Sequence, residues 1–274
     1  MLAQVNITTH NRPGLLRLCA GWLYRSIRKQ GLPIAMEVLD DESSDSRTGD
    51  VLTVLERQGV QVFRLKADNI DPVARLGWMR RQAVDRFLAN HKAGDFLVLL
   101  DDDVLTDGDT LADSIADYIL LQEAKASPGS LTLFGWLTLL SELELEKRVF
   151  GKLRITGDAH WIVDRETLKF IGRFFGYHIG GFADLPLLSL AKLGKFYYTR
   201  LVPLYNVQHL GFGSQTSAVG RPDTTEWTRR PYAIERESNR WLHVPGFDLH
   251  RYVDAARLLG NDKAAWQYAE KEGL

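Results

Sequence analysis

The chain has 274 residues, of which 45% are hydrophobic and 25% charged, so it can bury a core and is neither disordered nor fibrous. Its 34 basic and 35 acidic residues nearly cancel, which leaves no overall field to attract nucleic acid or an anionic membrane surface. One cysteine, Cys19, cannot form an internal disulfide or a cysteine zinc cluster. We expect one globular domain, alone or with an appendage, in a reducing compartment such as the cytoplasm and without a nucleic-acid partner.

The chain shows no segment typical of export or membrane insertion. Its N-terminus lacks a basic start followed by a long apolar core, so we expect no secretory signal and a mature chain that begins here. The most apolar stretch, Leu131 to Leu140, is about half of the roughly 20 residues that a membrane helix needs. We therefore expect no membrane span.

The first hundred residues alternate between short apolar runs and longer helical patterns. This alternation is typical of βαβ units on a mostly parallel, Rossmann-like sheet flanked by helices, and it predicts an α/β fold. The second and fourth runs are apolar almost throughout, as expected for strands covered on both faces. The expected strands are 3–8, 34–40, 61–65 and 96–101, and the expected helices are 15–29, 51–58 and 73–89.

The remainder of the chain has a less regular pattern. We expect a helix over 108–125, an apolar run over 130–140, strands at 161–163 and 196–199, and short helices at 166–171 and 185–193. The segment 220–240 is polar, with three prolines in or near it, and two helical patterns follow at 249–259 and 263–271. These features predict a main domain over 1–219 and a small C-terminal helical appendage over 220–274.

Carboxylates follow two of the expected strands directly. Asp101, Asp102 and Asp103 end the fourth strand, and Asp40 and Asp41 end the second. In open α/β sheets ligands bind at the carboxyl ends of the strands, and adjacent carboxylates repel unless a cation such as Mg2+ lies among them. A solvated acidic turn that caps the next helix is an equally open interpretation of the triplet. We expect the second cluster both to border the site and to cap the helix that follows it, through Ser43, Ser44 or Asp45.

The first strand ends in a polar turn, from Thr8 to Arg12, just before a helix that begins near Pro13. Neither GxGxxG nor GxxxxGK[ST] occurs in the chain, which argues against a dinucleotide-binding site and against a P-loop. Any nucleotide must therefore be bound in another way.

These segments, taken in order, resemble the inverting nucleotide-sugar glycosyltransferases of family 2, which have the GT-A fold. The resemblance begins with ThrHisAsnArgPro after the first strand, AspAspGluSerSerAsp after the second and AspAspAsp after the fourth. It continues with a glycine-led segment at 157–168 and with 181–194, which is similar to the family's EDxxLxxRxxxxG helix. Each motif alone is unspecific, but the ordered set covers residues 3 to about 215.

The resemblance implies a metal-dependent hexosyltransferase-type enzyme that moves a sugar from a nucleotide diphosphate to a hydroxyl of a saccharide or glycoconjugate, as in polysaccharide synthesis. It implies a nucleotide-binding half over 1–107, an acceptor-binding half over 108–219, and Mn2+ or Mg2+ at a DxD motif. Asp184 would be the catalytic base. The implied nucleotide-binding residues are Thr8, His10, Arg12, Asp41, Arg75, Arg81 and Asp102; the implied metal ligands are Asp101, Asp103 and His209; the implied acceptor-binding residues are Trp136, Gly157 and Asp158.

The chain departs from the family pattern at two positions, where Ala183 replaces the glutamate before the base and Leu190 replaces an arginine. These departures leave open a noncatalytic nucleotide-sugar binding protein of the same fold. A haloacid dehalogenase type phosphohydrolase is another alternative, because LeuLeuAspAspAspValLeuThr resembles that superfamily's nucleophile loop. The loop's position after three βα units, instead of near the N-terminus, favours the glycosyltransferase.

Overall fold

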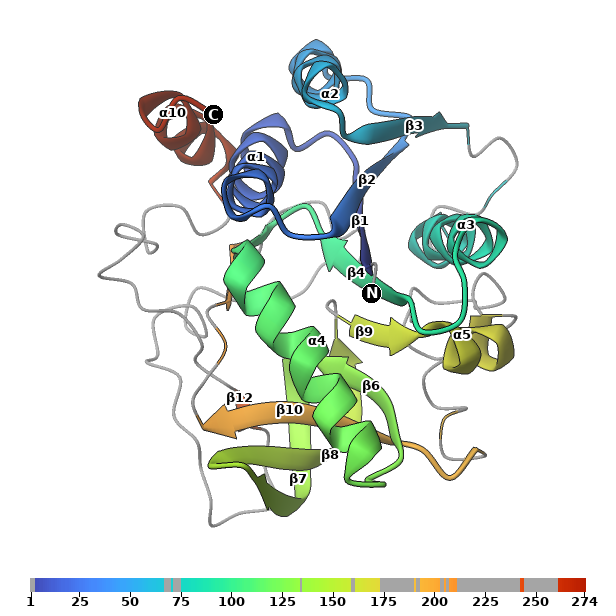
Figure 1. Ribbon diagram of the computed structural model, residues 1–274. Helices are drawn as coiled ribbons and strands as arrows, with labels where there is room; N and C mark the ends of the chain where they lie inside the picture. Colours follow the sequence, from blue (N-terminus) through green and yellow to red (C-terminus); the bar gives the residue numbers. More distant parts are fainter. Residues whose placement is uncertain are drawn as a thin grey trace.

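The computed structural model describes residues 3–66, 70, 75–133, 135–158, 161–172, 190, 193–202, 205, 207–210, 242–243 and 261–274. Helices and strands alternate along the first half, and strands predominate in the second (Figure 1). Within the described residues, no helix is both long and apolar enough to cross a bilayer. The elements are β1 (Ala3–Thr9), α1 (Pro13–Gln30), β2 (Ile34–Asp41), α2 (Ser46–Gln58), β3 (Gln61–Leu65), α3 (Arg75–Asn90), β4 (Phe96–Asp101), β5 (Val104–Thr106), α4 (Gly108–Glu123), β6 (Pro128–Thr132), β7 (Gly135–Leu145), β8 (Arg148–Asp158), β9 (Trp161–Asp164), α5 (Arg165–Ile171), β10 (Phe196–Val202), β11 (Val207–His209), β12 (Leu242–His243) and α10 (Asp262–Lys271).

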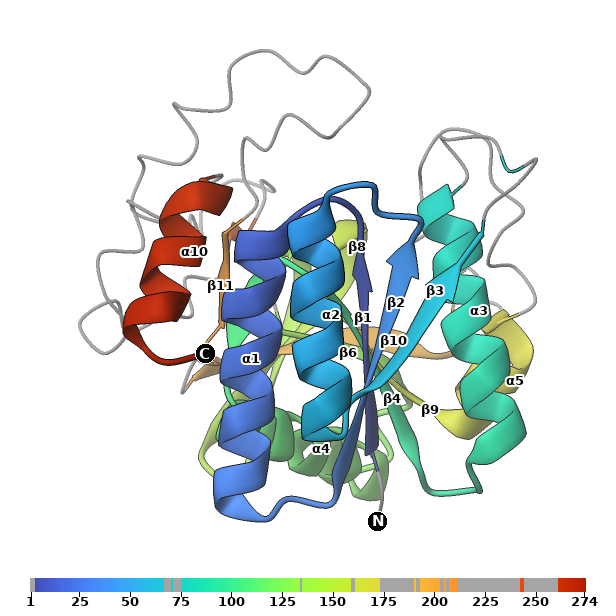
Figure 2. The same cartoon turned by 90° about the horizontal axis from the view of Figure 1, so that it is seen from above.

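The first four strands form a parallel sheet in the order β3-β2-β1-β4, which confirms the predicted α/β class. Helices α1, α2 and α4 lie on one face of this sheet, and α3 and α5 lie on the other (Figures 1 and 2). Strand β1 is flanked by β2 on one side and β4 on the other. Strands β2 and β3 are therefore added on one side of β1 and β4 on the other, so the strand order reverses at β1. Such a reversal is the usual ligand-binding position in open α/β sheets.

The second half of the sheet is mixed. Strand β9 runs antiparallel between β4 and β6, and β6 pairs in parallel with β10. Strands β7 and β8 form a long antiparallel hairpin that packs its β8 edge onto β10. The expected strands at 161–163 and 196–199 are confirmed as β9 and β10, whereas the sequence pattern did not predict the hairpin.

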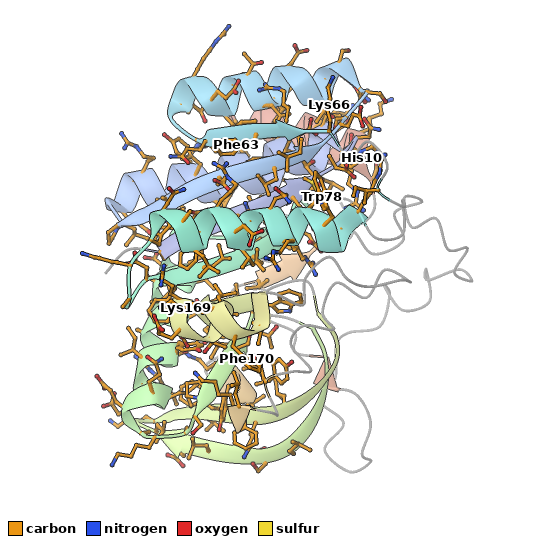
Figure 3. All side chains as sticks on the ribbon, turned by 90° about the vertical axis from the view of Figure 1, so that its right-hand side faces the viewer. His10, Phe63, Lys66, Trp78, Lys169 and Phe170 are labelled. Atoms are coloured by element: carbon orange, nitrogen blue, oxygen red, sulfur yellow. The ribbon has the colours of Figure 1, made fainter. Side chains whose placement is uncertain are left out.

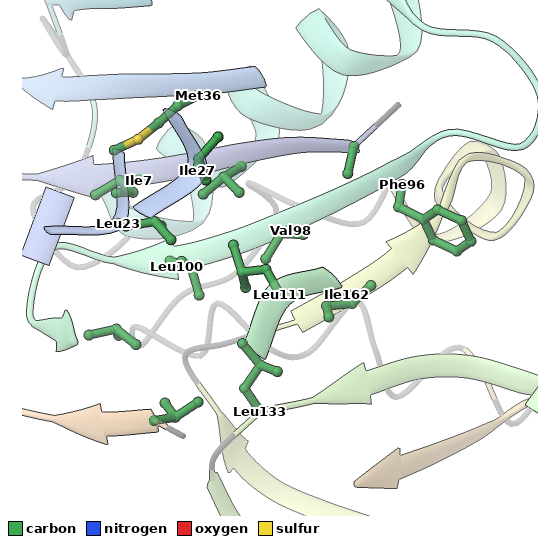
Figure 4. Close-up of a cluster of buried hydrophobic side chains, with 14 of the residues drawn as sticks. Ile7, Leu23, Ile27, Met36, Phe96, Val98, Leu100, Leu111, Leu133 and Ile162 are labelled. Atoms are coloured by element: carbon green, nitrogen blue, oxygen red, sulfur yellow. The ribbon is translucent and has the colours of Figure 1, made fainter. Parts of the chain in front are cut away.

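The apolar residues of the strands pack against both helical layers. Ile7 of β1, Val98 and Leu100 of β4 and Leu23 of α1 belong to one buried cluster, together with Leu111 of α4 (Figure 4). A second cluster on the opposite face contains Leu99, Val84 and Trp161, among others. Burial on both faces explains why these strands read as continuous apolar runs.

The C-terminal helix α10 packs against α1 (Figures 1 and 2). The Asp262 carboxylate accepts hydrogen bonds from the backbone N–H groups of Gly14 (2.8 Å) and Leu15 (2.9 Å), in the first turn of α1. Arg17 donates to the carbonyl oxygen of Leu274 and lies over the Trp266 ring. The described end of the predicted appendage is thus joined to the first half of the chain, while the expected boundary near residue 220 lies outside the described residues.

Candidate active site

The polar ends of β1, β2 and β4 meet at one edge of the sheet. In the strand register Thr8 lies opposite Asp101, and Thr9 lies opposite Asp40. Figure 3 shows His10 at this edge, on the same side as Lys66, which follows β3. The register therefore brings the three polar segments together, as their positions after neighbouring strands predict.

Two side chains from the β1 end bind the acidic triplet directly. The hydroxyl of Thr9 donates to Asp102 Oδ2 at 2.6 Å. Arg12 Nη1 donates to both Asp102 Oδ1 (3.0 Å) and Asp103 Oδ2 (2.5 Å). The side chains of Asp102 and Asp103 are each only 4% exposed, whereas that of Arg12 is 20% exposed. A single guanidinium nitrogen thus lies between two buried carboxylates.

The third carboxylate of the triplet, Asp101, pairs with a different arginine. Arg80 Nη2 of α3 lies 3.1 Å from Asp101 Oδ1, and its side chain is 4% exposed. The Arg80 guanidinium also lies over the Trp161 ring, 4.5 Å from its centroid. Since a buried arginine needs partners for its charge, the ion pair and the ring fix both Arg80 and Asp101.

The electrostatics of the triplet follow from burial and crowding. Burial raises the pKa of Asp102 to about 7; Arg12 opposes this shift, and the neighbouring carboxylates Asp103 and Asp101 add to it. Burial opposes the charge on Arg12, but the same three carboxylates more than compensate and raise its pKa. The triplet therefore favours a nearby positive charge, which Arg12 and Arg80 supply in this structure.

A second part of the site lies at the end of β2. Asp41 Oδ1 is 3.6 Å from Arg75 Nη1, and its backbone oxygen is 2.5 Å from His10 Nδ1. Burial raises the pKa of Asp41, and Arg75 acts against this shift. A carboxylate, a ring and a guanidinium from three different elements therefore converge at the sheet edge beside the triplet.

Asn11 holds this edge together. It adopts a left-handed backbone conformation (φ 51°), which asparagine tolerates better than most residues. Its side-chain oxygen accepts hydrogen bonds from the backbone N–H groups of Ser44 and Asp45, and its own N–H donates to the Ser43 hydroxyl. Asp45 in turn caps α2 through the N–H of Arg47. The capping role expected for the second cluster is confirmed for Asp45.

A late segment of the chain returns to the triplet. Strand β11 pairs antiparallel with β5, which places His209 opposite Val104, the residue after Asp103. The N–H of Leu210 donates to the carbonyl oxygen of Asp103 at 2.7 Å. The backbone thus brings His209 beside the acidic triplet across more than 100 residues of sequence.

The acceptor residues implied by the resemblance are placed by strand pairing. Trp136 of β7 lies opposite Gly157 of β8, and Asp158 lies opposite Gly135. All three belong to one end of the β7–β8 hairpin, which is also the end that leads into β9. Asp184, the implied catalytic base, lies outside the described residues.

Of the two adjacent arginines in α3, the predicted nucleotide-binding residue Arg81 is not the one that contacts the triplet. Arg81 pairs with Asp85 (2.7 Å) and donates to the Gly172 carbonyl oxygen, away from the triplet. Arg80, which sequence reasoning did not select, is the one that contacts Asp101. A signal was present, because Arg80 falls within the apolar stripe formed by Met79, Ala83, Val84 and Phe87, and a charged residue on a buried helix face needs a specific partner.

Among the described residues, no group of three or more His, Cys, Asp or Glu side chains is arranged as a metal site. The carboxylates instead face the two arginines. Their oxygens are nevertheless the ligands that hard divalent cations prefer, and two buried carboxylates already share one positive centre here. The donor set therefore fits such a cation.

No protein family model matches the sequence, and no curated protein matches it significantly. Solved structures do resemble the fold. The mannosyltransferase PcManGT from Pyrobaculum calidifontis, in complex with GDP-Man and Mn2+, aligns over 71% of this chain and 53% of its own, with 17% identity and a TM-score of 0.48. S. aureus TarS 1–349, in complex with UDP, aligns over 75% of this chain and 59% of its own, with 17% identity and a TM-score of 0.48. The chain thus spans little more than half the length of these distant neighbours.

Proposed function

We propose that the chain is a metal-dependent inverting glycosyltransferase of the GT-A type, which transfers a sugar from a nucleotide diphosphate to an acceptor hydroxyl. The observation that supports this most strongly is the triplet Asp101–Asp103, with Asp102 and Asp103 buried, at the point where the strand order reverses and in contact with Arg12 and Arg80. Sugar transfer needs a cationic site for the leaving diphosphate, and the triplet, as a donor set for a divalent cation, is suited to form one.

Each part of the site takes a role in this proposal. Thr8, His10 and Asp41 border the base, and Arg12 and Arg75 serve the diphosphate, with Asp102 toward the ribose. Arg81 would have to leave Asp85 and the Gly172 carbonyl oxygen to join them. Asp101, Asp103 and His209 hold Mn2+ or Mg2+, a cation that supplies Lewis-acid stabilisation of negative charge. Support for the metal role comes from the oxygen donors of the triplet and from the backbone pairing that brings His209 beside them.

The second half of the chain supplies the acceptor side. Trp136, Gly157 and Asp158 line the acceptor site in this proposal, at the end of the β7–β8 hairpin. The acceptor oxygen bonds to the anomeric carbon as the bond from that carbon to the diphosphate breaks, and Asp184 takes the acceptor's proton. Attack on the face opposite the leaving group inverts the configuration.

The proposal is tested by incubating the protein with a panel of nucleotide sugars and Mn2+ and measuring the release of nucleoside diphosphate, with and without candidate saccharide acceptors. We expect release from one donor, faster with an acceptor. Asp184→Asn should lower kcat by about 10²- to 10⁴-fold with donor affinity nearly unchanged. Unchanged turnover in this variant would exclude Asp184 as the base. Hydrolysis of an aryl phosphate, without release from any donor, would favour a phosphohydrolase instead.

A further inference from the structure

Arg12 occupies space beside Asp103, the proposed metal ligand, and also contacts Asp102. Its Nη1 atom lies 3.0 Å from Asp102 Oδ1 and 2.5 Å from Asp103 Oδ2. A metal ion bound to Asp103 through this Oδ2 atom would have to lie within about 2.0–2.6 Å of it. A guanidinium nitrogen and a metal ion cannot share that space.

The local charge leads to the same conclusion. Three carboxylates face two guanidiniums in this structure, Arg80 on Asp101 and Arg12 on the other two, which leaves one negative charge in excess. A divalent cation added to both arginines would leave an excess of positive charge in a buried site, and like charges close together in low dielectric repel strongly. If Arg12 leaves as the cation enters, the carboxylates and the remaining cations balance.

The position of Arg12 allows such a movement, whereas that of Arg80 does not. Arg12 precedes the first turn of α1, outside both β1 and the helix, and its side chain is 20% exposed. Arg80 lies within α3, is 4% exposed and is held under the Trp161 ring. The Arg12 side chain can therefore swing out by rotating its own bonds, at the edge where a diphosphate would bind.

We propose that Arg12 is an internal counter-cation of the acidic triplet, which a divalent cation must displace, and that the released guanidinium then pairs with the donor's diphosphate. This inference rests on the proposed function. It predicts that the cation alone binds weakly and that a nucleoside diphosphate strengthens its binding, because the diphosphate gives the displaced arginine a new partner. Arg12 is thus a positioning residue that couples the two ligands.

Titration calorimetry with Mn2+ alone, and then with Mn2+ in saturating nucleoside diphosphate, tests the coupling. For the wild-type protein we expect weak binding of Mn2+ alone and at least tenfold tighter binding with the nucleotide. Arg12→Gln should bind Mn2+ alone about tenfold more tightly than wild type, since no charge-assisted hydrogen bond must be broken first. In Arg12→Gln, added nucleoside diphosphate should tighten Mn2+ binding only a few-fold.

The matched control is Arg57→Gln, which removes the same charge from an exposed position. Helix α2 begins at the site edge and ends at Gln58, so Arg57 lies roughly 15–20 Å away at a rise of 1.5 Å per residue. We expect the Mn2+ affinity of Arg57→Gln to match that of wild type.

If Arg12→Gln folds only with Mn2+ present, the counter-cation role is supported. If it does not fold at all, the wild-type titrations decide: at least tenfold tighter Mn2+ binding with the nucleotide supports the coupling, and equal binding overturns it.

The outcomes separate the two proposals. If wild type binds Mn2+ with nucleotide but Arg12→Gln binds Mn2+ alone no more tightly than wild type, the counter-cation role is wrong and the proposed function stands. If neither protein binds Mn2+ or a nucleoside diphosphate under any condition, the proposed function fails, and this inference fails with it.

Discussion

Replacing Asp117 of α4 should destabilise the protein far more than replacing its neighbour Asp113. Asp117 is fully buried and accepts hydrogen bonds from Arg200 (2.5 and 2.7 Å), Arg148 (2.8 Å) and the Tyr205 hydroxyl (2.6 Å). Asp113, one turn earlier, is 61% exposed and lies 3.6 Å from the same Arg200. The two carboxylates therefore share one partner but differ in burial.

The magnitude follows from what each substitution leaves behind. Asp117→Ala leaves Arg200, whose side chain is 5% exposed, with most of its charge uncompensated in the interior, and such a loss costs about 3–5 kcal/mol. Asp113→Ala removes a surface ion pair worth about 0–1 kcal/mol. Since native domains are stable by about 5–15 kcal/mol, the first substitution removes a large part of the total.

Urea denaturation followed by fluorescence measures both variants against wild type. We expect the free energy of unfolding to fall by about 3–5 kcal/mol for Asp117→Ala and by less than about 1 kcal/mol for Asp113→Ala. The network joins α4 to β8, to β10 and to Tyr205, just before β11. Equal, small losses in the two variants would refute the idea that this carboxylate holds the second half of the sheet in place.

Other substitutions test the packing around α1. Gly14→Ala should lower stability by about 1–3 kcal/mol in thermal unfolding, because the added Cβ would lie 1.9 Å from the Asp262 carbonyl oxygen. Gly49→Ala in α2 is its control, since that Cβ meets nothing within 4 Å, and a slight gain is expected. Cys19 is buried, which raises its pKa, so the native thiol stays protonated and should react with an aromatic disulfide reagent only on unfolding; rapid reaction of the native protein would contradict its burial.

The sequence was most informative where one physical signal dominated. Apolar runs that end in polar residues predicted the parallel strands β1, β2 and β4, and neighbouring strand ends predicted that Asp41 and Asp101–Asp103 would share an edge. The β7–β8 hairpin was not predicted, although residues 142–146 and 152–155 alternate between polar and apolar residues as strands do. The turn between them lacks the two-residue Asn-Gly or Asp-Gly signal of a hairpin. Its turn instead has Glu146 and Lys147 at positive φ, which those residue types do not signal.

The site was only partly predictable for a related reason. Residue types at strand ends identified the carboxylates, but which arginine pairs with which carboxylate depends on helix rotation and on long-range packing. Arg80 contacts Asp101 because α3 turns that face toward the sheet, and Trp161 comes from a strand about 80 residues later. The position of His209 beside Val104 likewise depends on the β5–β11 pairing, which no local pattern encodes.

Titration of nucleoside diphosphates into the protein, with Mn2+ or with a chelator, tests the central claim most directly. We expect tight binding of at least one nucleoside diphosphate with Mn2+, loss of that binding with chelator, and the same loss in Asp103→Ala even when Mn2+ is present. His209→Ala should lose less, because water can partly replace a single ligand. Equal nucleotide affinity with and without the metal, or unchanged nucleotide affinity in Asp103→Ala, would contradict the assignment of the triplet as a metal-binding site.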